Sequence, residues 1–526
     1  MTLLLPLKQR FHLSWLTLAL AALSASAATL TVTNTADSGV GSLRDAIATA
    51  NSGDVINFSL PNPSTITLTS GPLDISKNLV IMGPGATQLA VDANHQSSVF
   101  VTAGTVTLSG LTIKNGTAIN GGGILNLRTL TVTNSTLLAN SASSGGGGIY
   151  NEPEGTVTVI NSTLSGNSAM FGGGIRNSGI PNNIGISNTP LGVFTLAQST
   201  LSGNSASSGG GGIENEGVFT LTNSTLSGNS ANSGGGIRNN STTYTPPALT
   251  LVNSTVSGNS TSGGGGGGIQ NFNGAITVKS TLLANNGSDG NCLLLDITNS
   301  LGYNLSDDST CTLSGPGDEN NVTSGAGLDP KGLQNNGGLT QTIAPLPSSP
   351  AVDHIPVADC TDANGNPVST DQLGIARPQG KGCDVGAYEL VPAAPFASFR
   401  PALAIDDGKH PGFVLTSTFT LGSATTGLYP ATEPMTLQID NYMLTLPAGS
   451  FHQLWKAANA PYGYEGTVHG ATVVLGLIPL GNNTFSFDAA GSPVTFPGIT
   501  NPVTVTLSFG TTDTGTDSVK ALIRNF

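Results

Sequence analysis

The feature that most constrains the fold is an internal repeat between about residues 106 and 287. The block Asn-Ser-Thr-Leu-Ser-Gly-Asn-Ser-Ala occurs at Asn161–Ala169 and again at Asn223–Ala231. Close variants begin at Asn134, Gln198, Asn253 and Lys279. The serines at their second position recur every 25 to 37 residues, so a basic unit of about 25 residues carries insertions. A repeat of this length is typical of a solenoid, in which each unit packs on its neighbours.

The segments between these blocks have the pattern of short strands. Thr156–Ile160 and Val218–Leu221 mix apolar with small polar residues at a period close to two. Gly, Asn and Ser separate such runs, and these residues tolerate the left-handed backbone of tight corners. About three strands fit into one unit, which predicts an all-β parallel β-helix. Roughly ten coils would form a rod about 50 Å long at about 4.8 Å per coil.

Identical residues recur at fixed positions within the unit and predict side-chain ladders. An inward isoleucine ladder comprises Ile124, Ile149, Ile175, Ile213, Ile237 and Ile269. An asparagine ladder two residues further on comprises Asn126, Asn151, Asn177, Asn215, Asn239 and Asn271. Stacked asparagines satisfy one another and the corner backbone. The variable column between the ladders is expected to face solvent, because neighbouring residues of a strand point in opposite directions. Its members are Leu125, Tyr150, Arg176, Glu214, Arg238 and Gln270.

The N-terminus has the pattern of an export signal. Lys8 and Arg10 precede an apolar stretch, and Ala25-Ser26-Ala27 forms an A-x-A cleavage site, which predicts a mature chain from Ala28. No later segment is long and apolar enough to predict a transmembrane helix. The chain carries 17 Lys and Arg against 30 Asp and Glu, and this acidic balance argues against nucleic-acid binding.

Four cysteines in an exported chain predict disulfides rather than a zinc site, since none has C-x-x-C spacing. Three pairings are possible. Sequence proximity favours Cys292 with Cys311 and Cys360 with Cys383.

Ser42 begins a short predicted helix near the N-terminus. Ser42 and Asp45 form a capping box, and Leu43, Ala46, Ile47 and Ala50 share one helical face. An open β-helix end exposes unpaired backbone and apolar interior. The helix is therefore expected to cap the N-terminal end.

Several motifs resemble those of bacterial exported surface proteins. The segment around Gly41-Ser42-Leu43-Arg44-Asp45-Ala46 resembles the CSLREA-type N-terminal domain, although Gly41 replaces its cysteine and Asp45 its glutamate. The Gly-Gly-Ile-x-Asn and Ser-Gly-Asn blocks resemble the right-handed β-helices of those proteins and, loosely, polymorphic outer-membrane protein repeats. Thr370–Gly374 and Cys383–Glu389, with Asn335–Thr340 before them, resemble the choice-of-anchor Q domain. The resemblance implies a right-handed, pectate-lyase-like solenoid, export to the cell surface or outer membrane, and no established catalysis.

The β-helix scaffold also carries polysaccharide lyases and hydrolases, which need paired carboxylates or an acidic calcium site. Residues 96 to 288 contain no Asp or His, and their only acids are Glu152, Glu154, Glu214 and Glu216, which we interpret as solvated corner carboxylates. No catalytic, cofactor-binding or metal residue is therefore assigned. Calcium at Asp307-Asp308 with Asp318-Glu319, and a catalytic pair of His354 with Asp353, are the weaker alternatives.

The last part of the chain is predicted to be a separate β-sandwich. The predicted division is a signal peptide at 1–27, the capped β-helix at 28–391, a proline-rich linker at 392–401 and the sandwich at 402–526. Strands of sandwich spacing begin at Gly412. Trp455, Tyr462 and Tyr464 either stack on carbohydrate or pack in the core.

These features predict an exported, non-enzymatic secreted or surface protein acting in adhesion or cell-envelope interaction. Its partner would be a carbohydrate or a cell-surface protein, and a pectate-lyase-type enzyme is the alternative.

Overall fold

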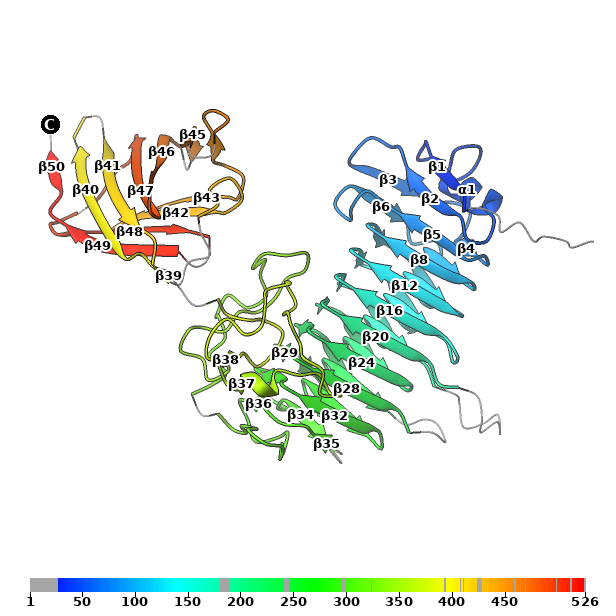
Figure 1. Cartoon of the computed structure of the whole chain (residues 1–526). Coiled ribbons are helices and arrows are strands. Elements are labelled where there is room, and N and C mark those ends of the chain that lie inside the picture. The colour runs from blue at the N-terminus through cyan, green and yellow to red at the C-terminus, as the bar shows by residue number, and fades with distance from the viewer. Residues whose placement is uncertain are drawn as a thin grey trace, which may run out of the picture.

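The computed structural model describes residues 27–524 except 180–189, 241–245, 295–298, 323, 392–393, 407, 410, 423–427, 458–459, 469, 498 and 511–512. The predicted signal peptide at 1–27 thus lies outside the described residues, apart from Ala27. The parallel β-helix expected from the repeat is confirmed: it has about ten turns, and an antiparallel β region follows it (Figure 1).

Four parallel sheets run along the solenoid, and every turn in its middle contributes one strand to each. Sheet 1 contains β1 (Thr29–Val32), β2 (Val55–Phe58), β5 (Leu79–Met82), β8 (Thr105–Ser109), β12 (Thr129–Thr133), β16 (Thr156–Ile160), β20 (Val193–Ala197), β24 (Val218–Thr222), β28 (Ala248–Val252), β32 (Ala275–Lys279) and β35 (Asn299–Ser300). Sheet 2 contains β3 (Ser64–Thr67), β6 (Leu89–Asp92), β9 (Thr112–Lys114), β13 (Thr136–Leu138), β17 (Thr163–Ser165), β21 (Thr200–Ser202), β25 (Thr225–Ser227), β29 (Thr255–Ser257), β33 (Leu282–Ala284) and β36 (Leu305–Ser306). Sheet 3 contains β10 (Thr117–Asn120), β14 (Ser141–Gly145), β18 (Ser168–Phe171), β22 (Ser205–Gly209), β26 (Ser230–Ser233) and β30 (Ser260–Thr261). Sheet 4 contains β4 (Leu73–Ile75), β7 (Phe100–Thr102), β11 (Ile124–Asn126), β15 (Ile149–Asn151), β19 (Ile175–Asn177), β23 (Ile213–Asn215), β27 (Ile237–Asn240), β31 (Ile269–Phe272) and β34 (Cys292–Leu294).

The expectation of three strands per turn was wrong, because sheet 3 adds a fourth. Its strands have sequences such as Ser-Ala-Ser-Ser-Gly, which lack the apolar alternation that marks the other three. Each of these strands pairs in parallel with the equivalent strand of the next coil. The corner between sheets 1 and 2 is left-handed, with φ of 50° at Asn134 and 46° at Asn223, which explains the asparagine that opens each repeat block.

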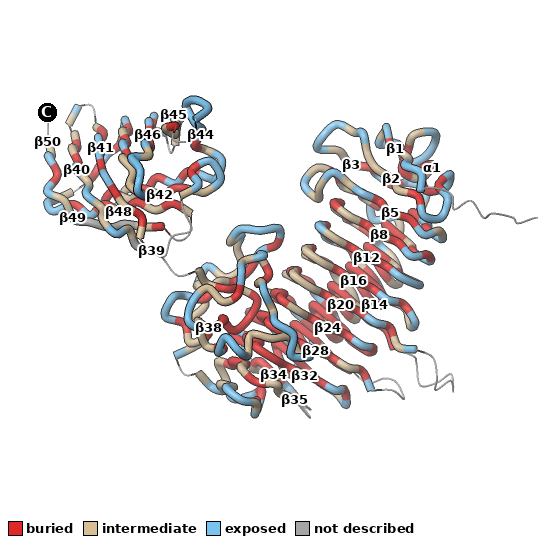
Figure 2. Tube along the Cα trace, viewed as in Figure 1, coloured by how far each residue is buried: buried red, intermediate tan, exposed pale blue. Residues whose placement is uncertain are grey.

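Both predicted ladders are confirmed. The six isoleucines pair in register along sheet 4 and are at most 2% exposed, within the core that fills the coils (Figure 2). The asparagine amides form a chain of hydrogen bonds: Asn151 Nδ2 donates to Asn177 Oδ1 at 2.9 Å, and Asn177 Nδ2 donates to Asn215 Oδ1 at 3.0 Å. A second ladder, which the sequence analysis did not identify, uses the asparagine of each Ser-Gly-Asn block; Asn204 Nδ2 donates to Asn229 Oδ1 at 2.9 Å.

The N-terminal cap is the short helix expected from the sequence. Helix α1 (Leu43–Thr49) begins at the N-cap Ser42, whose side chain accepts a hydrogen bond from the Asp45 amide at 3.2 Å. Leu43, Ala46 and Ile47 are buried in the same core as the first coils, and α1 lies at that end of the solenoid in Figure 1. The helix therefore covers apolar interior that the first coil would otherwise expose.

Both favoured disulfides are present, Cys292–Cys311 and Cys360–Cys383. The second joins the segment after η2 (Val357–Asp359) to β38 (Gly382–Cys383), which pairs with β37 (Ile355–Pro356). We call residues 328–391 the strap, because they do more than close the C-terminal end. They turn back along sheet 2 and hydrogen-bond to coils as far as Gln198.

The C-terminal region forms two sheets that share one hydrophobic core, as expected of a sandwich. One sheet contains β39 (Ala394–Pro395), β49 (Asp513–Val519), β48 (Val503–Phe509), β42 (Met435–Ile439) and β43 (Tyr442–Leu446). The other contains β44 (His452–Gln453), β45 (Tyr462–Val468), β46 (Ala471–Gly481), β47 (Thr484–Ser492), β41 (Gly412–Thr420), β40 (Ser398–Asp406) and β50 (Leu522–Arg524). The linker predicted at 392–401 is shorter than expected, since β40 already begins at Ser398.

Candidate functional site

The variable column between the ladders is covered, so the expectation that it faces solvent was wrong. Glu214 is fully buried, Gln270 is 2% exposed and Tyr150 is 7% exposed. Each strand of sheet 3 ends in a glycine turn and folds back against the outer side of sheet 4. Gly209 leaves room for this packing, because a Cβ there would lie 2.4 Å from an Arg238 guanidinium nitrogen.

Arginine, glutamate and aromatic side chains stack in and beside the covered column. Arg176 Nη2 lies 3.0 Å from Glu216 Oε1, and Arg238 Nη1 lies 3.4 Å from Glu214 Oε1. The Phe171 ring lies 5.3 Å from the Arg176 guanidinium carbon and 5.9 Å from that of Arg238. Desolvated cation–π contacts of this kind stabilise the charge beneath the strand that covers it.

Burial dominates the electrostatics of this stack. It raises the pKa of Glu214 to about 8, although Arg238 and the nearby Asn240 side chain lower it. Burial also raises the pKa of Glu152, with Arg176 lowering it.

The interpretation of all four glutamates as solvated corner carboxylates is therefore corrected. Glu154 is exposed and Glu152 is partly buried, whereas Glu214 and Glu216 are buried and paired with arginines. A glycosidase needs one accessible acid and one accessible base on either side of the substrate bond. Glu214 and Glu216 meet neither requirement, so the stack joins two sheets and does not form a catalytic site.

The acidic residues proposed as a calcium site are occupied by hydrogen bonds within the chain. Asp308 accepts from the Thr310 and Asn291 amides at 2.9 and 2.8 Å. Asp318 accepts from the Asn304 amide at 2.8 Å. These carboxylates fix the turns at the C-terminal end of the solenoid, and no group of three or more His, Cys, Asp or Glu in the described ranges is placed to hold a metal ion.

His354 and Asp353 do not form a catalytic pair. The His354 ring lies 2.7 Å from the Gly317 carbonyl oxygen through Nε2 and 3.7 Å from Glu319 through Nδ1. Asp353 accepts instead from the Gly382 amide at 3.1 Å. Both side chains help to position the loops of the C-terminal cap.

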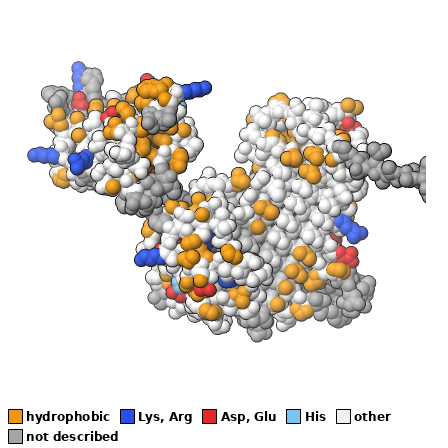
Figure 3. Space-filling model, viewed as in Figure 1, with side chains coloured by type: hydrophobic (Ala, Val, Ile, Leu, Met, Phe, Trp, Pro, Cys, Tyr) orange, Lys and Arg blue, Asp and Glu red, His pale blue; other side chains and the backbone are white. Residues whose placement is uncertain are grey.

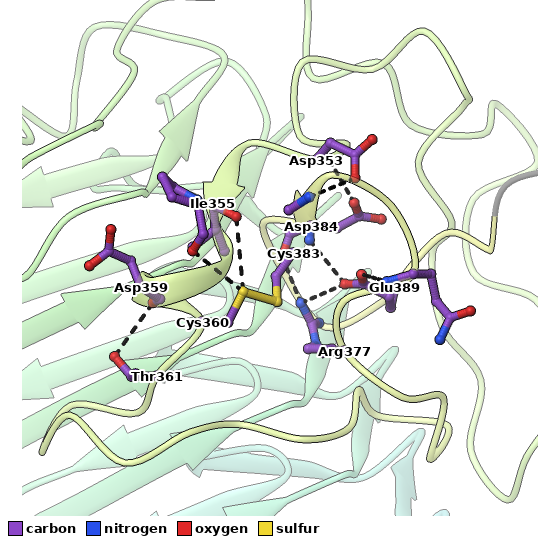
Figure 4. The surroundings of a disulfide bond; sticks show 12 residues. Asp353, Ile355, Asp359, Cys360, Thr361, Arg377, Cys383, Asp384 and Glu389 are labelled. Atoms are coloured by element: carbon purple, nitrogen blue, oxygen red, sulfur yellow. Dashed lines mark hydrogen bonds and ion pairs between the residues drawn. A yellow bond between two sulfur atoms is a disulfide. The ribbon is translucent and has the colours of Figure 1, made fainter.

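Charged residues of the strap form a buried network beside the second disulfide (Figure 4). Arg377 Nη1 lies 3.1 Å from Glu389 Oε2, with both side chains 1% exposed, and donates to the Asp384 carbonyl at 2.7 Å. Burial raises the pKa of Glu389 to about 7, and Arg377 lowers it. Asp371 accepts from the Leu373 amide at 2.8 Å. Each charged residue of this network thus fixes a bend of the strap.

Gln372 fastens the strap to sheet 2. Its carbonyl oxygen accepts from the Thr225 hydroxyl at 2.7 Å, and its amide nitrogen donates to the hydroxyls of Thr200 and Thr340, both at 2.9 Å. One coil further on, the Ala387 amide donates to the Thr255 hydroxyl at 3.0 Å. A column of stacked threonines therefore provides the hydrogen-bonding surface for a polypeptide that crosses the coils.

Sheet 1 presents a longer threonine column, to whose hydroxyls the described residues of the strap make no hydrogen bond. Seven in-register residues belong to it: Thr107, Thr131, Thr158, Thr195, Thr220, Thr250 and Thr277. All seven are half-buried, and none of their hydroxyls bonds to another group within the described part of the chain. The outward positions beside them, from β8 to β32, are Thr, Ser, Val, Ala or Ile, apart from Lys279, whose ammonium donates to Thr361 of the strap. Over the solenoid, Figure 3 shows charged side chains only at the margins. We call this surface the threonine face.

The sandwich offers less to a ligand. Tyr462 and Tyr464 pack against its core, whereas Trp455 is 58% exposed. An apolar hollow of about 520 Å³ lies on the outer side of the longer sheet, lined by Val414, Val474 and Leu522 among others. Phe413 is the aromatic residue among those that line this hollow, and its side chain belongs to the hydrophobic core.

No family model, no curated protein and no solved structure matches the chain.

Proposed function

We propose that this is an exported, secreted or surface-located binding protein that acts in adhesion or cell-envelope interaction through the threonine face. The observation that carries the proposal is the column of seven threonine hydroxyls that have no hydrogen-bonding partner among the described residues. Neighbouring coils repeat at about 4.8 Å, so the face offers one methyl and one hydroxyl at that interval along the solenoid. Such a surface suits an extended, uncharged partner with repeated hydroxyl or amide groups, as a structural polysaccharide has.

The disulfides also support a location outside the cell. Both disulfides are of the kind that persists in oxidising compartments. No helix among the described residues is long and apolar enough to cross a membrane. The A-x-A pattern at Ala25–Ala27 supplies the route.

The direct test is co-sedimentation of the purified chain with insoluble cellulose, chitin and peptidoglycan. Lysines at Thr158, Thr195 and Thr220 place three charges on the face and should abolish binding to the polysaccharide retained by the wild type. The matched control places lysines at Ser205, Ser230 and Ser260, an exposed in-register column of sheet 3. Equal loss in both variants, or no binding by the wild type, would contradict the proposal.

A second test separates binding from catalysis. We expect no soluble product from these polysaccharides in the presence of calcium, because Glu214 and Glu216 are buried and packed against arginine side chains. If cleavage occurred and replacement of Glu152, Glu214 and Glu216 by Gln abolished it, the binding proposal would be replaced by an enzymatic one.

A further inference from the structure

The predicted cleavage point lies next to a buried carboxylate. The Ala28 backbone nitrogen is 2.8 Å from Asp54 Oδ1, and Asp54 is only 4% exposed. Its other carboxylate oxygen accepts from the Asn51 amide at 2.7 Å. Asp54 thus binds two backbone nitrogens at the first turn of the solenoid, and one of them would become the chain terminus after processing.

The fold fixes this juxtaposition. Asp54 immediately precedes β2, and Ala28 immediately precedes β1, its parallel partner, with Thr29 opposite Val55. The Ala28 carbonyl accepts from the Val55 amide at 2.9 Å. The start of β1 cannot move away from Asp54 without breaking this pairing, while Ala27 and Ala28 both remain exposed to a peptidase.

Resting on the proposed export, we propose that Asp54 is a binding site for the α-ammonium group formed when the chain is cleaved between Ala27 and Ala28. A peptidase adds water across the peptide bond: the C–N bond breaks, the hydroxyl joins the Ala27 carbonyl carbon and the Ala28 nitrogen takes up protons. One neutral N–H donor becomes a cation with three donors, held against a carboxylate of opposite charge. Charge-assisted hydrogen bonds are shorter and stronger than neutral ones.

The local charges agree with this assignment. The two backbone hydrogen bonds hold the pKa of Asp54 below its usual range, and Lys77 lowers it further, so the carboxylate is ionised at neutral pH. Lys77 itself donates to the Ala48 carbonyl at 2.8 Å at the end of α1 and does not hydrogen-bond to Asp54. The new ammonium therefore gains a direct anionic partner, and processing strengthens the first strand of sheet 1.

The test is a double-mutant cycle between the N-terminus and Asp54 on the full mature chain. One form begins at Ala28, released from a fusion by a protease that leaves no extra residue. The other carries Gly-Ser before Ala28, which restores a neutral amide. Each is made with and without Asp54→Asn, and hydrogen exchange of the β1 and β2 amides is followed by mass spectrometry.

We expect β1 and β2 amides to exchange at least tenfold faster in the extended form than in the Ala28 form. Asp54→Asn should abolish that difference, and Asp74→Asn, an exposed acid on neighbouring β4, should preserve it. Equal exchange in the two wild-type forms would overturn the inference even if the variant failed to fold.

N-terminal sequencing of chain exported from cells should give Ala28. A different N-terminal residue would overturn the proposed role of Asp54 without affecting the export proposal. A chain that keeps its leader in the cytoplasm would overturn the export proposal, and the hydrogen-exchange cycle would then decide the role of Asp54.

Discussion

Replacement of Glu214 by Gln should make the solenoid more stable above about pH 5. Glu214 is fully buried under sheet 3, and desolvation raises its pKa from 4.5 to about 8 despite the opposing effect of Arg238. At pH 7 the folded chain therefore keeps this carboxyl mostly protonated, whereas the unfolded chain ionises it. Gln is nearly isosteric with the protonated acid and carries no ionisable proton, so it reproduces the folded state without that cost.

The size of the effect follows from linkage. Between about pH 4.5 and 8 the unfolded state binds fewer protons than the folded state at this residue, so stability falls as pH rises. Each pH unit in this window costs about 1.4 kcal/mol. The wild type should lose about 3 kcal/mol relative to the variant between pH 4.5 and 7, and about 5 kcal/mol above pH 8.

Native-state hydrogen exchange is the appropriate assay, because a solenoid opens locally and a single free energy of unfolding does not describe it. The exchange rates of the β23 and β27 amides are compared in wild type and variant at pH 5, 7 and 8.5. At each pH the ratio of the two rates is taken, because the intrinsic exchange rate cancels in that ratio. Glu154→Gln removes an exposed carboxylate near the same corners and should leave the ratio unchanged. A wild-type-to-variant ratio that does not change with pH would refute the argument that Glu214 holds a proton when folded.

Three further changes test the ladders and the cross-links. Ile175→Asp places an unpaired charge between coils and should cost several kcal/mol, and unchanged thermal stability would show that this position does not face inward. Asn177→Ala removes four side-chain hydrogen bonds and should lower local stability by about 3 kcal/mol in exchange experiments, against little effect from Asn232→Ala at an exposed site. Replacing Cys292 and Cys311 by Ser should cost about 3 kcal/mol, and non-reducing peptide mapping that found another pairing would contradict the assignment.

The sequence predicts those parts of the fold in which one residue type recurs in phase. Ile213 and Asn215 could be placed because the same pair stands at the same point of six units, and a parallel stack makes equivalent positions neighbours. The Ser-Gly-Asn asparagine gave an equally regular signal, and its ladder could have been found in the same way.

Sheet 3 could not be predicted by hydrophobic pattern. Ser205–Gly209 has no apolar alternation, and it forms a strand because the equivalent segments of the neighbouring coils stack above and below it. This strand covers Glu214. The alternation of residues along sheet 4 alone therefore predicts the wrong exposure for the Glu214 side chain. The course of the strap was equally hidden, because Gln372 meets Thr225 across 147 residues of sequence and no local pattern specifies the contact.

The strap bears on function because it shows what a threonine column of this solenoid can bind. Over the coils of Thr200, Thr225 and Thr255, the hydroxyls bond to a carbonyl, a glutamine side chain and a backbone amide. All of these partners are uncharged, and they belong to a segment that runs across the coils rather than along one strand. The threonine face of sheet 1 repeats the same group over seven coils, and no group in the described part of the chain hydrogen-bonds to these hydroxyls. An extended, uncharged polymer with regularly spaced hydrogen-bonding groups satisfies that surface as the strap satisfies sheet 2. Because neither the threonine face nor such a polymer carries charge, the binding affinity should change little between 0.05 and ~1 M salt. A partner held by ion pairs would be released over that range.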